Sequence, residues 1–373
     1  MDTTVDLDTF SSLVERPDES ARRAAEERWQ RLDKPPAGLG RLEELGSWLA
    51  SVQGASPVRP LNAAKVVLFA GDHGVAALGV SRPTAARTAQ RVQAVLDGTA
   101  PVAVLARRYG ADVRVVDLAV DADPAEFPAE VTQHRVRRGS GRIDVEDALT
   151  PEETVRAFRA GIAVADEEAD SGTDVIVLGD LGAGSTTVAA VLVGALCGTD
   201  AAAVTGRGSG IDDHVWMVKC SAVRDALRRA RPVLGDQLAL LGTVGGADFA
   251  AITGFLLQAA ARKLPVVLDG AVSAACALVA QRIAFRAPEW WRAGQSSGEP
   301  AQAKAYDRLT LTPLQSLEVS TGEGVGALLA LPLLQAASDT LADPADTLLV
   351  TKVTRAPQEQ PPLPSAAELL GRV

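Results

Sequence analysis

KVVLFAGDHG at residues 65–74 is the stretch that decides the fold, because its run of apolar and β-branched residues ends at glycine and aspartate. Four later stretches repeat this pattern: DVRVVDLAV (112–120), DVIVLGD (174–180), AAAVTGRG (201–208) and LPVVLDG (264–270). Short apolar runs of this kind are typical of strands buried on both faces. The sequence therefore predicts five buried strands.

Stretches rich in Ala and Leu separate or follow these strands and are long enough to form crossover helices. They cover residues 84–109, 151–170, 185–198, 213–231, 247–262 and 271–286. Strands that alternate with helices favour an α/β fold with a doubly wound, mostly parallel sheet flanked by helices. Because such sheets bind ligands beyond the carboxyl ends of their strands, we expect the binding site at these strand ends.

The regions outside this pattern predict a smaller helical domain made from both ends of the chain. Two amphipathic helices are expected near the N-terminus, at about 20–33 and 41–53. We predict four parts in chain order: an N-terminal helical part of the small domain (1–60), an α/β nucleotide-binding domain (61–287), a return segment with a helix from about residue 325 (288–341), and a mobile Pro-rich tail (342–373).

Composition argues against several classes of partner. The net charge is −10 and the basic residues are scattered, so a nucleic-acid surface is not expected. The acidic N-terminus lacks the pattern of a secretory signal, and the longest nearly uncharged runs, such as 188–198, are too short to span a bilayer. The three cysteines and three histidines lack the spacing of a metal site. These features predict a cytoplasmic protein with no membrane segment and no metal.

Two glycine-rich turns could hold an anion. GDLGAGSTT (179–187) follows a predicted strand and opens a helix, so its backbone N–H groups and hydroxyls could cradle a phosphate, with Asp180 at the rim. A tight turn that merely needs glycine is the alternative. GRGSGIDD (206–213) repeats the design and is followed by Lys219, which is either a cation for phosphate or a solvated surface lysine.

Three further positions with a carboxylate are candidate functional residues. Asp72 and His73 in GDHGV could form a nucleophile, a metal ligand or a structural turn. Asp269 ends a strand, where it either faces a ligand or caps the next helix. Glu323 lies between two glycines before an apolar helix, so it is either functional or an acid favoured by the helix dipole.

Seven blocks together resemble, in order and spacing, the nicotinate-nucleotide:dimethylbenzimidazole phosphoribosyltransferase family. They are KPPAGLGRLEEL (34–45), FAGDHGV (69–75), GDLGAGSTT (179–187), GRGSGIDD (206–213), VGGADFAAITG (244–254), AARKLPVVLDG (260–270) and GEGVGALLALPLLQAA (322–337). The resemblance implies transfer of phosphoribose from nicotinate mononucleotide to 5,6-dimethylbenzimidazole, which gives α-ribazole 5′-phosphate for the nucleotide loop of cobalamin. It also implies a homodimer that needs no cofactor.

The resemblance assigns roles to individual residues. It implies that Glu323 is the general base, and we take Asp180 as the second catalytic residue. The residues implied to bind phosphate and ribose are Gly182, Gly184, Ser185, Thr186, Gly206, Gly208, Lys219, Gly245, Gly246 and Asp269. Ser81 and Gln90 lie where the family contacts the base.

The sequence also departs from the family pattern. Asp180 and Ser185 replace the usual glutamate and asparagine of the glycine loop, and Arg82 replaces an aromatic residue. A His-Arg-Ser-Ala-Glu-Pro-Gly-His block becomes Gln-Ser-Ser-Gly-Glu-Pro-Ala-Gln at 295–302. These changes keep two alternatives open: a phosphoribosyltransferase for another azole or a phenolic base, and a non-catalytic nucleotide-binding sensor of the same fold.

Overall fold

Five strands form a parallel sheet in the order β2-β1-β3-β4-β5 in the computed structural model, which describes residues 5–82 and 84–342. Their bounds are β1 Ala64–Gly71, β2 Ala111–Ala119, β3 Val175–Leu181, β4 Val266–Leu268 and β5 Trp291–Ala293. The α/β fold class expected from the sequence is therefore confirmed. The order reverses direction between β1 and β3, so the chain winds outward from this pair on both sides.

One predicted strand is wrong. AAAVTGRG was expected as a strand, but Ala201–Val204 forms the short helix α9, followed by a turn. Three consecutive alanines favour a helix over a strand, and the Asp200 side chain caps this helix by accepting a hydrogen bond from the Ala203 amide. The fifth strand is instead β5, in the predicted return segment, where no strand was expected.

Helices fill most of the remaining described chain. The α-helices are α1 Asp8–Leu13, α2 Glu19–Arg31, α3 Arg41–Gln53, α4 Ala85–Leu96, α5 Pro101–Tyr109, α6 Ala129–Thr132, α7 Pro151–Asp170, α8 Ser185–Cys197, α9, α10 Asp213–Ala230, α11 Gln237–Val244, α12 Ala247–Ala261, α13 Gly270–Ile283, α14 Pro300–Leu309, α15 Val325–Leu328 and α16 Leu331–Ala342. Short 3-10 helices cover Gly74–Leu78, Pro124–Glu126, Arg231–Val233 and Ala287–Trp290. The single helix expected over 84–109 is broken in two where Gly98 adopts a left-handed conformation and Pro101 starts α5.

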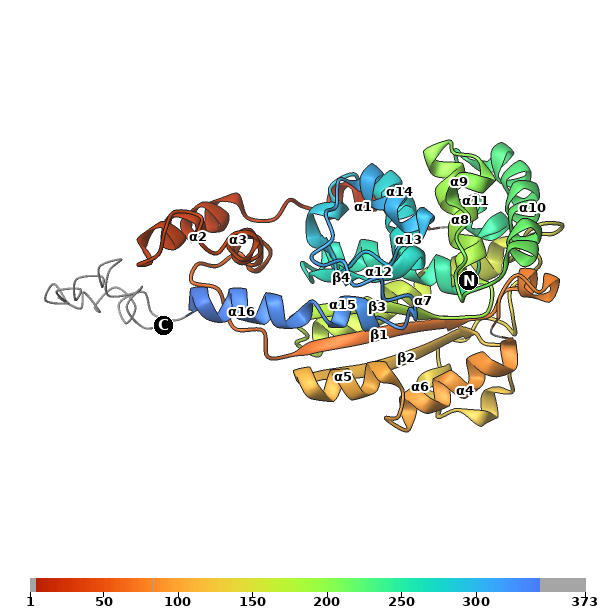
Figure 1. Ribbon diagram of the computed structural model, residues 1–373, viewed down its shortest axis with the longest axis horizontal. Helices are drawn as coiled ribbons and strands as arrows, with labels where there is room; N and C mark the ends of the chain where they lie inside the picture. Colours follow the sequence, from red (N-terminus) through yellow and green to blue (C-terminus); the bar gives the residue numbers. More distant parts are fainter. Residues whose placement is uncertain (1–4, 83, 343–373) are drawn as a thin grey trace, which may run out of the picture.

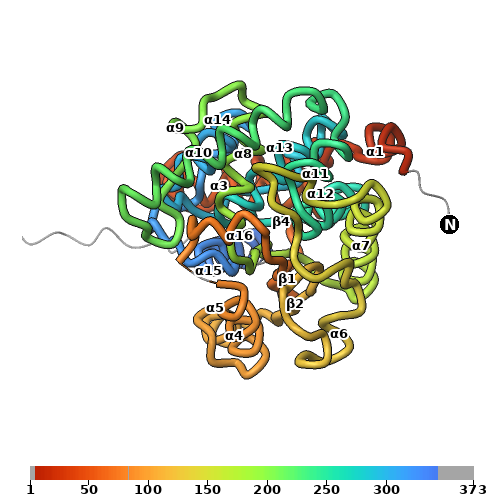
Figure 2. Tube along the Cα trace, turned by 90° about the vertical axis from the view of Figure 1, so that its right-hand side faces the viewer, coloured from red at the N-terminus to blue at the C-terminus, as the bar shows by residue number. Residues whose placement is uncertain are grey.

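The helices lie on both sides of the sheet. α12 packs on β1, β2 and α7, and α13 packs on β3. On the other side α5 packs on β2 and α15, and α15 also packs on β3. Figure 1 shows α4, α5 and α6 below β2 with α12 and α13 above β1, and Figure 2 shows the same separation from the side. The sheet is therefore covered on both faces, as an all-parallel sheet requires.

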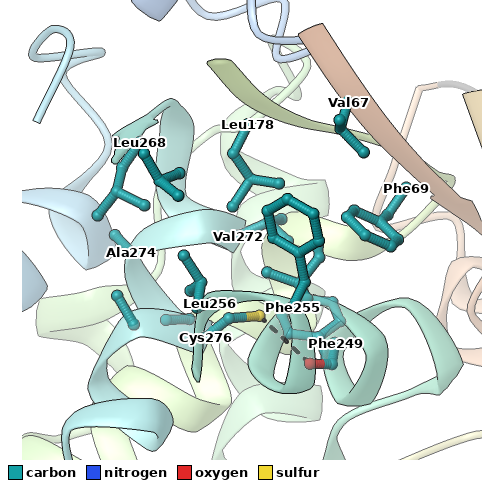
Figure 3. Packing of buried hydrophobic residues seen from close by; sticks show 14 of the residues in the cluster. Val67, Phe69, Leu178, Phe249, Phe255, Leu256, Leu268, Val272, Ala274 and Cys276 are labelled. Atoms are coloured by element: carbon teal, nitrogen blue, oxygen red, sulfur yellow. Dashed lines mark hydrogen bonds between the residues drawn. The ribbon is translucent and has the colours of Figure 1, made fainter. Parts of the chain in front are cut away.

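The apolar core lies between the sheet and the layer formed by α12 and α13. The rings of Phe69 and Phe255 meet edge to face with centroids 5.4 Å apart, and both residues are fully buried. Cys276 Sγ lies 3.6 Å from the Phe249 carbonyl in the same layer (Figure 3). All three cysteines are free, and Cys276 is fully buried. This packing fixes β1, β3 and β4 side by side, and their carboxyl ends form one edge.

A group of helices from both ends of the chain packs together away from that edge. α16 contacts both α3 and α2, which also contact each other. By length and composition Val325–Ala342 is the one described stretch that could cross a membrane, but 56% of it is buried inside the fold. The domain boundaries remain a prediction; β5 adds part of the return segment to the sheet, and all but the first residue of the expected mobile tail lies outside the described residues.

Candidate active site

The carboxyl ends of β1 and β3 meet where the strand order reverses, and this is where open α/β sheets bind their ligands. The two strands run in register, with Phe69 opposite Asp180 and Ala70 opposite Leu181. The GDHGV and GDLGAGSTT turns therefore leave the sheet next to each other. Most of the functional residues expected from the sequence lie around this point.

Asp72 joins the turns around the site. Its Oδ1 accepts hydrogen bonds from Thr88 Oγ1 at 2.6 Å and from the Ala183 amide at 2.9 Å, while Oδ2 accepts one from the Asp121 amide at 2.9 Å. Burial raises the pKa of Asp72, although these donors oppose the shift. Of the alternatives left open for this residue, the structural turn fits these contacts, because the carboxylate is fully engaged in holding three segments together.

His73 lies beside Asp72 but pairs with a different carboxylate. Its Nε2 lies 3.2 Å from Asp248 Oδ2, and both side chains are buried. Burial by itself lowers the pKa of His73, but the neighbouring Asp248 carboxylate holds it above its usual value. A Cβ at Gly246 would lie 2.8 Å from the ring of His73. Gly245 and Gly246 therefore belong to the packing behind the site and do not line its cavity.

The first glycine turn brings backbone close to backbone. A Cβ at Gly182 would lie 2.0 Å from the Gly71 carbonyl oxygen, so only glycine fits there. Gly184 has a left-handed conformation and precedes α8, which starts at Ser185. The Ser185 hydroxyl donates to the Gly182 carbonyl at 3.3 Å. This turn therefore needs glycine for steric reasons and also presents the N-terminus of α8 to the cavity.

The second glycine turn holds a buried lysine. Lys219 is 1% exposed, and its Nζ donates to Thr186 Oγ1 at 2.9 Å and to the Gly206 carbonyl at 3.1 Å. Of the two alternatives left open for this residue, the solvated surface lysine is therefore wrong. Burial lowers the pKa of Lys219, and the nearby Glu299 carboxylate opposes the shift. Gly206, Gly208, Thr186 and Lys219 form what we call the phosphate end.

Glu323 comes to the same edge from the far end of the chain. It is 5% exposed and has a left-handed backbone, with φ of 61°, which is unusual for a residue with a side chain. Its amide donates to the Asp180 carbonyl at 3.2 Å. A Cβ at Gly179 would lie 2.3 Å from the Gly324 nitrogen. The loop that carries Glu323 is therefore packed directly against the backbone of β3.

Arg91 is the residue near Glu323 that the sequence analysis missed. Its Nε donates to Glu323 Oε1 at 2.5 Å, its Nη2 forms an ion pair with the same oxygen, and Nη2 also donates to the Thr321 carbonyl at 2.9 Å. A regularly spaced helix gives no sign of which polar residue reaches a loop more than 200 positions away. We call Glu323, Arg91 and Asp180 the base end.

Two buried carboxyl groups at this edge of the sheet, Asp180 and Asp269, have raised pKa values. Burial and the charge of Asp248 raise the pKa of Asp180 to about 6. Burial and the charge of Asp180 raise the pKa of Asp269 to about 7. Asp269 does not cap α13 with its side chain; its Oδ1 accepts a hydrogen bond from the Ala327 amide at 3.1 Å, at the start of α15. The helix-capping alternative is therefore wrong.

A cavity of about 80 Å³ lies at this edge of the sheet, and Gly206, Lys219, Asp269 and Glu323 are not among the residues that line it. The expected site residues that line it are Ser81, Asp180, Gly182, Gly184, Ser185, Thr186 and Gly208. Arg91, Ser297 and Glu299 line it too and were not expected as site residues. Gln90 lies instead in a separate cavity with Asp121 and Phe127. The 80 Å³ cavity adjoins a further cavity of about 720 Å³, and the linings of these two share Gly208, Ser297, Glu299 and Ser320.

Two larger cavities, of about 790 and 920 Å³, lie elsewhere. The first is lined mainly by α2 and α3, and the second by loops at the amino ends of β3 and β4. Neither contains a residue from the carboxyl edge of the sheet. Within residues 5–82 and 84–342, no group of three or more His, Cys, Asp or Glu side chains could hold a metal ion.

Comparisons with known proteins show which family the chain belongs to. Residues 14–347 match a family model described as phosphoribosyltransferase. The chain is 66% identical over 342 residues to the nicotinate-nucleotide–dimethylbenzimidazole phosphoribosyltransferase of Streptomyces avermitilis, covering 91% of each protein. It is 51% identical over 334 residues to the enzyme of the same name from Mycolicibacterium paratuberculosis, covering 90% of this chain and 95% of that one.

A solved structure has the same fold. The nicotinate-nucleotide–dimethylbenzimidazole phosphoribosyltransferase of Thermus thermophilus superimposes with a TM-score of 0.81 at 36% identity, covering 87% of this chain and 96% of that one. The family model spans every residue of the phosphate and base ends, and the two relatives match 91% and 90% of this chain. The chain therefore belongs to the nicotinate-nucleotide–dimethylbenzimidazole phosphoribosyltransferase family.

Proposed function

We propose that this protein transfers the phosphoribosyl group of nicotinate mononucleotide to 5,6-dimethylbenzimidazole, giving α-ribazole 5′-phosphate and nicotinate. The observation that carries the proposal is a buried lysine held against two glycine turns together with a buried glutamate whose loop packs on the carboxyl end of β3. Lys219 can pair with a phosphate, and Glu323 can accept a proton. Membership of the family supplies the reaction that needs both.

The phosphate end holds the 5′-phosphate of the mononucleotide. Lys219 supplies a positive charge that is already fixed by Thr186 and the Gly206 carbonyl, so little side-chain entropy is lost on binding. Backbone N–H groups of the turn and of the first turn of α8 supply further donors. This end binds and orients the substrate but takes no part in proton transfer.

The leaving group needs no acid. The ring nitrogen of nicotinate is a pyridinium in the substrate and departs as a neutral pyridine, so it carries its electrons away without a proton. The ribosyl carbon gains oxocarbenium character as this bond breaks. The Asp180 carboxylate, once ionised, is the negative charge at the cavity wall that stabilises this centre.

The attacking base does need a proton acceptor. Benzimidazole attacks through its unprotonated ring nitrogen, and the remaining N–H becomes acidic as the new bond forms. We assign Glu323 as the general base that takes this proton. Both contacts from Arg91 to the Glu323 carboxylate go to Oε1, so we assign Oε2 as the oxygen available to the incoming base. Ser81 lines the 80 Å³ cavity together with Arg91 and Asp180 and is assigned to the base site, whereas Gln90 lies outside that cavity.

The test is to incubate the purified protein with nicotinate mononucleotide and a panel of bases, and to follow nicotinate release and nucleotide product by mass. The panel contains 5,6-dimethylbenzimidazole, other azoles and phenols. Product with dimethylbenzimidazole as the best substrate supports the proposal. Product with only another base supports the alternative acceptor, and binding without any nicotinate release supports a sensor. We further propose that the protein is a cytoplasmic homodimer, which sedimentation and cell fractionation test.

A further inference from the structure

Glu299 reaches into the phosphate end from a segment that follows β5. Its Oε1 accepts a hydrogen bond from the Gly208 amide at 2.8 Å. A Cβ at Gly206 would lie 2.1 Å from Glu299 Oε2, so the carboxylate lies directly against the glycine turn. A Cβ at Gly208 would in turn lie 3.2 Å from Lys219 Nζ. The Glu299 carboxylate therefore accepts the hydrogen bond of a backbone amide in the turn that we assigned to the substrate's phosphate.

Two anions cannot share this position. A backbone N–H that donates to a carboxylate at 2.8 Å has no capacity left for a phosphate oxygen. A phosphate next to Lys219 would also lie within a few ångströms of the Glu299 charge, and two like charges about 4 Å apart repel strongly in a partly buried site. Either the phosphate binds elsewhere or the Glu299 side chain leaves.

The backbone around Glu299 is firmly held, so the side chain is the part that can move. Gln302 Oε1 accepts hydrogen bonds from both the amide and the hydroxyl of Ser297, each at 2.7 Å. Gln302 Nε2 donates to the Gln295 carbonyl at 3.1 Å. Pro300 begins α14 immediately after Glu299, and Glu299 makes no capping bond to that helix. The side chain is thus free of helix capping while its backbone is fixed.

We propose that the Glu299 carboxylate takes the place of the substrate's phosphate on the Gly208 amide and is displaced when a phosphorylated ligand binds. This rests on the proposed function, which places the phosphate at Gly206, Gly208 and Lys219. Glu299 holds the Gly208 amide in the absence of phosphate and weakens the hold of the site on any phosphorylated ligand. It therefore limits affinity for the mononucleotide and for the phosphorylated product alike.

Calorimetry on Glu299→Gln tests the proposal. Glutamine keeps an oxygen that accepts from Gly208 but loses the charge, so we expect about tenfold tighter binding of nicotinate mononucleotide and of inorganic phosphate. Binding of nicotinate riboside, which lacks the phosphate, should not change. Glu318→Gln is the matched control, because Glu318 is an exposed carboxylate on the rim of the neighbouring cavity and its removal should change affinity less than twofold.

Equal or weaker binding of the mononucleotide by Glu299→Gln overturns the proposal, as does an equal gain for the riboside. A second measurement needs no variant: inorganic phosphate should shift the Gly208 amide resonance of the glycine-labelled wild-type protein, and saturation without such a shift contradicts displacement. Inorganic phosphate also separates the two hypotheses. If the protein binds phosphate as expected but releases no nicotinate from the mononucleotide, the proposed function fails while the displacement of Glu299 stands.

Discussion

The phosphate end and the base end of the site lie at the same edge of one sheet but are built in different ways. The phosphate end consists of two glycine turns and a lysine that follows the second turn within 13 residues. The base end joins Arg91, Asp180 and Glu323, which lie far apart in the sequence. The first is mainly backbone and is local, whereas the second depends on side chains brought together by the whole fold. Substitutions at the phosphate end should therefore lower affinity for the mononucleotide, and substitutions at the base end should lower turnover.

The largest effect is expected at the base end, from Glu323→Gln. Loss of a general base should lower turnover at least about 10²-fold, while affinity for nicotinate mononucleotide changes little because glutamine keeps the size of the side chain. Single-turnover kinetics and calorimetry on the same preparation measure the two quantities. Turnover near that of the wild type would show that another group, such as Asp180, accepts the proton.

Lys219→Met should mainly lower affinity for the mononucleotide, in contrast to the loss of turnover expected for Glu323→Gln. Methionine fills the space of the lysine stem but removes the charge, and a charge-assisted hydrogen bond is worth roughly 1.5–3 kcal/mol. Affinity for the mononucleotide should therefore fall about 10- to 100-fold, while affinity for nicotinate riboside stays the same. An equal loss for both ligands would mean that Lys219 supports the turn and does not contact the phosphate.

Arg91→Gln tests whether the base end depends on its cation. Without the two contacts to Oε1, Glu323 should be less well oriented, and turnover should fall about tenfold with little change in mononucleotide affinity. Arg87→Gln is the matched control, because Arg87 is exposed on the same helix and donates to Gln90. If both variants behave alike, the loss comes from the charge of α4 and the Arg91–Glu323 pair has no special role. Arg91→Lys should recover part of the turnover.

Asp269→Asn should change stability more than turnover. The folded protein raises the pKa of this carboxyl to about 7 from 3.8, so the folded state holds the proton more tightly than the unfolded state does. Its stabilising contribution is complete below about pH 4 and is lost as the pH rises through 7. Asparagine does not titrate and still accepts from the Ala327 amide. Relative to the wild type, the variant should therefore gain about 3 kcal/mol between pH 5 and pH 8.

Thermal and urea unfolding at both pH values measure this gain. Asp174→Asn offers a comparison at the opposite edge of the sheet, where the carboxylate accepts from the Asn62 and Ala63 amides. A constant difference between Asp269→Asn and the wild type across this pH range would show that Asp269 does not titrate in the folded protein near neutrality.

Most local features were predicted from the sequence, whereas contacts between distant segments were not. KVVLFAG forms β1 because a continuous apolar run suits a strand buried on both faces, and the glycine turns follow because backbone approaches backbone there. AAAVTGRG failed because its alanines favour a helix once Asp200 caps it. The burial of Lys219 could not be predicted, because the pattern of α10 does not show that the Thr186 and Gly206 turns pack against it. Arg91 and Glu299 act on residues more than 90 positions away, and nothing in their neighbourhood points to that.

The close approach of Gly179 to Gly324 changes how a mutational scan of this protein should be interpreted. Gly179 does not line the cavity and carries no chemistry, yet any side chain there would collide with the backbone that presents Glu323. Substitutions at Gly179 would rank with those of Glu323, the proposed general base, in a screen for activity. A screen for folded, soluble protein would separate them, since Glu323 variants should remain abundant and Gly179 variants should not.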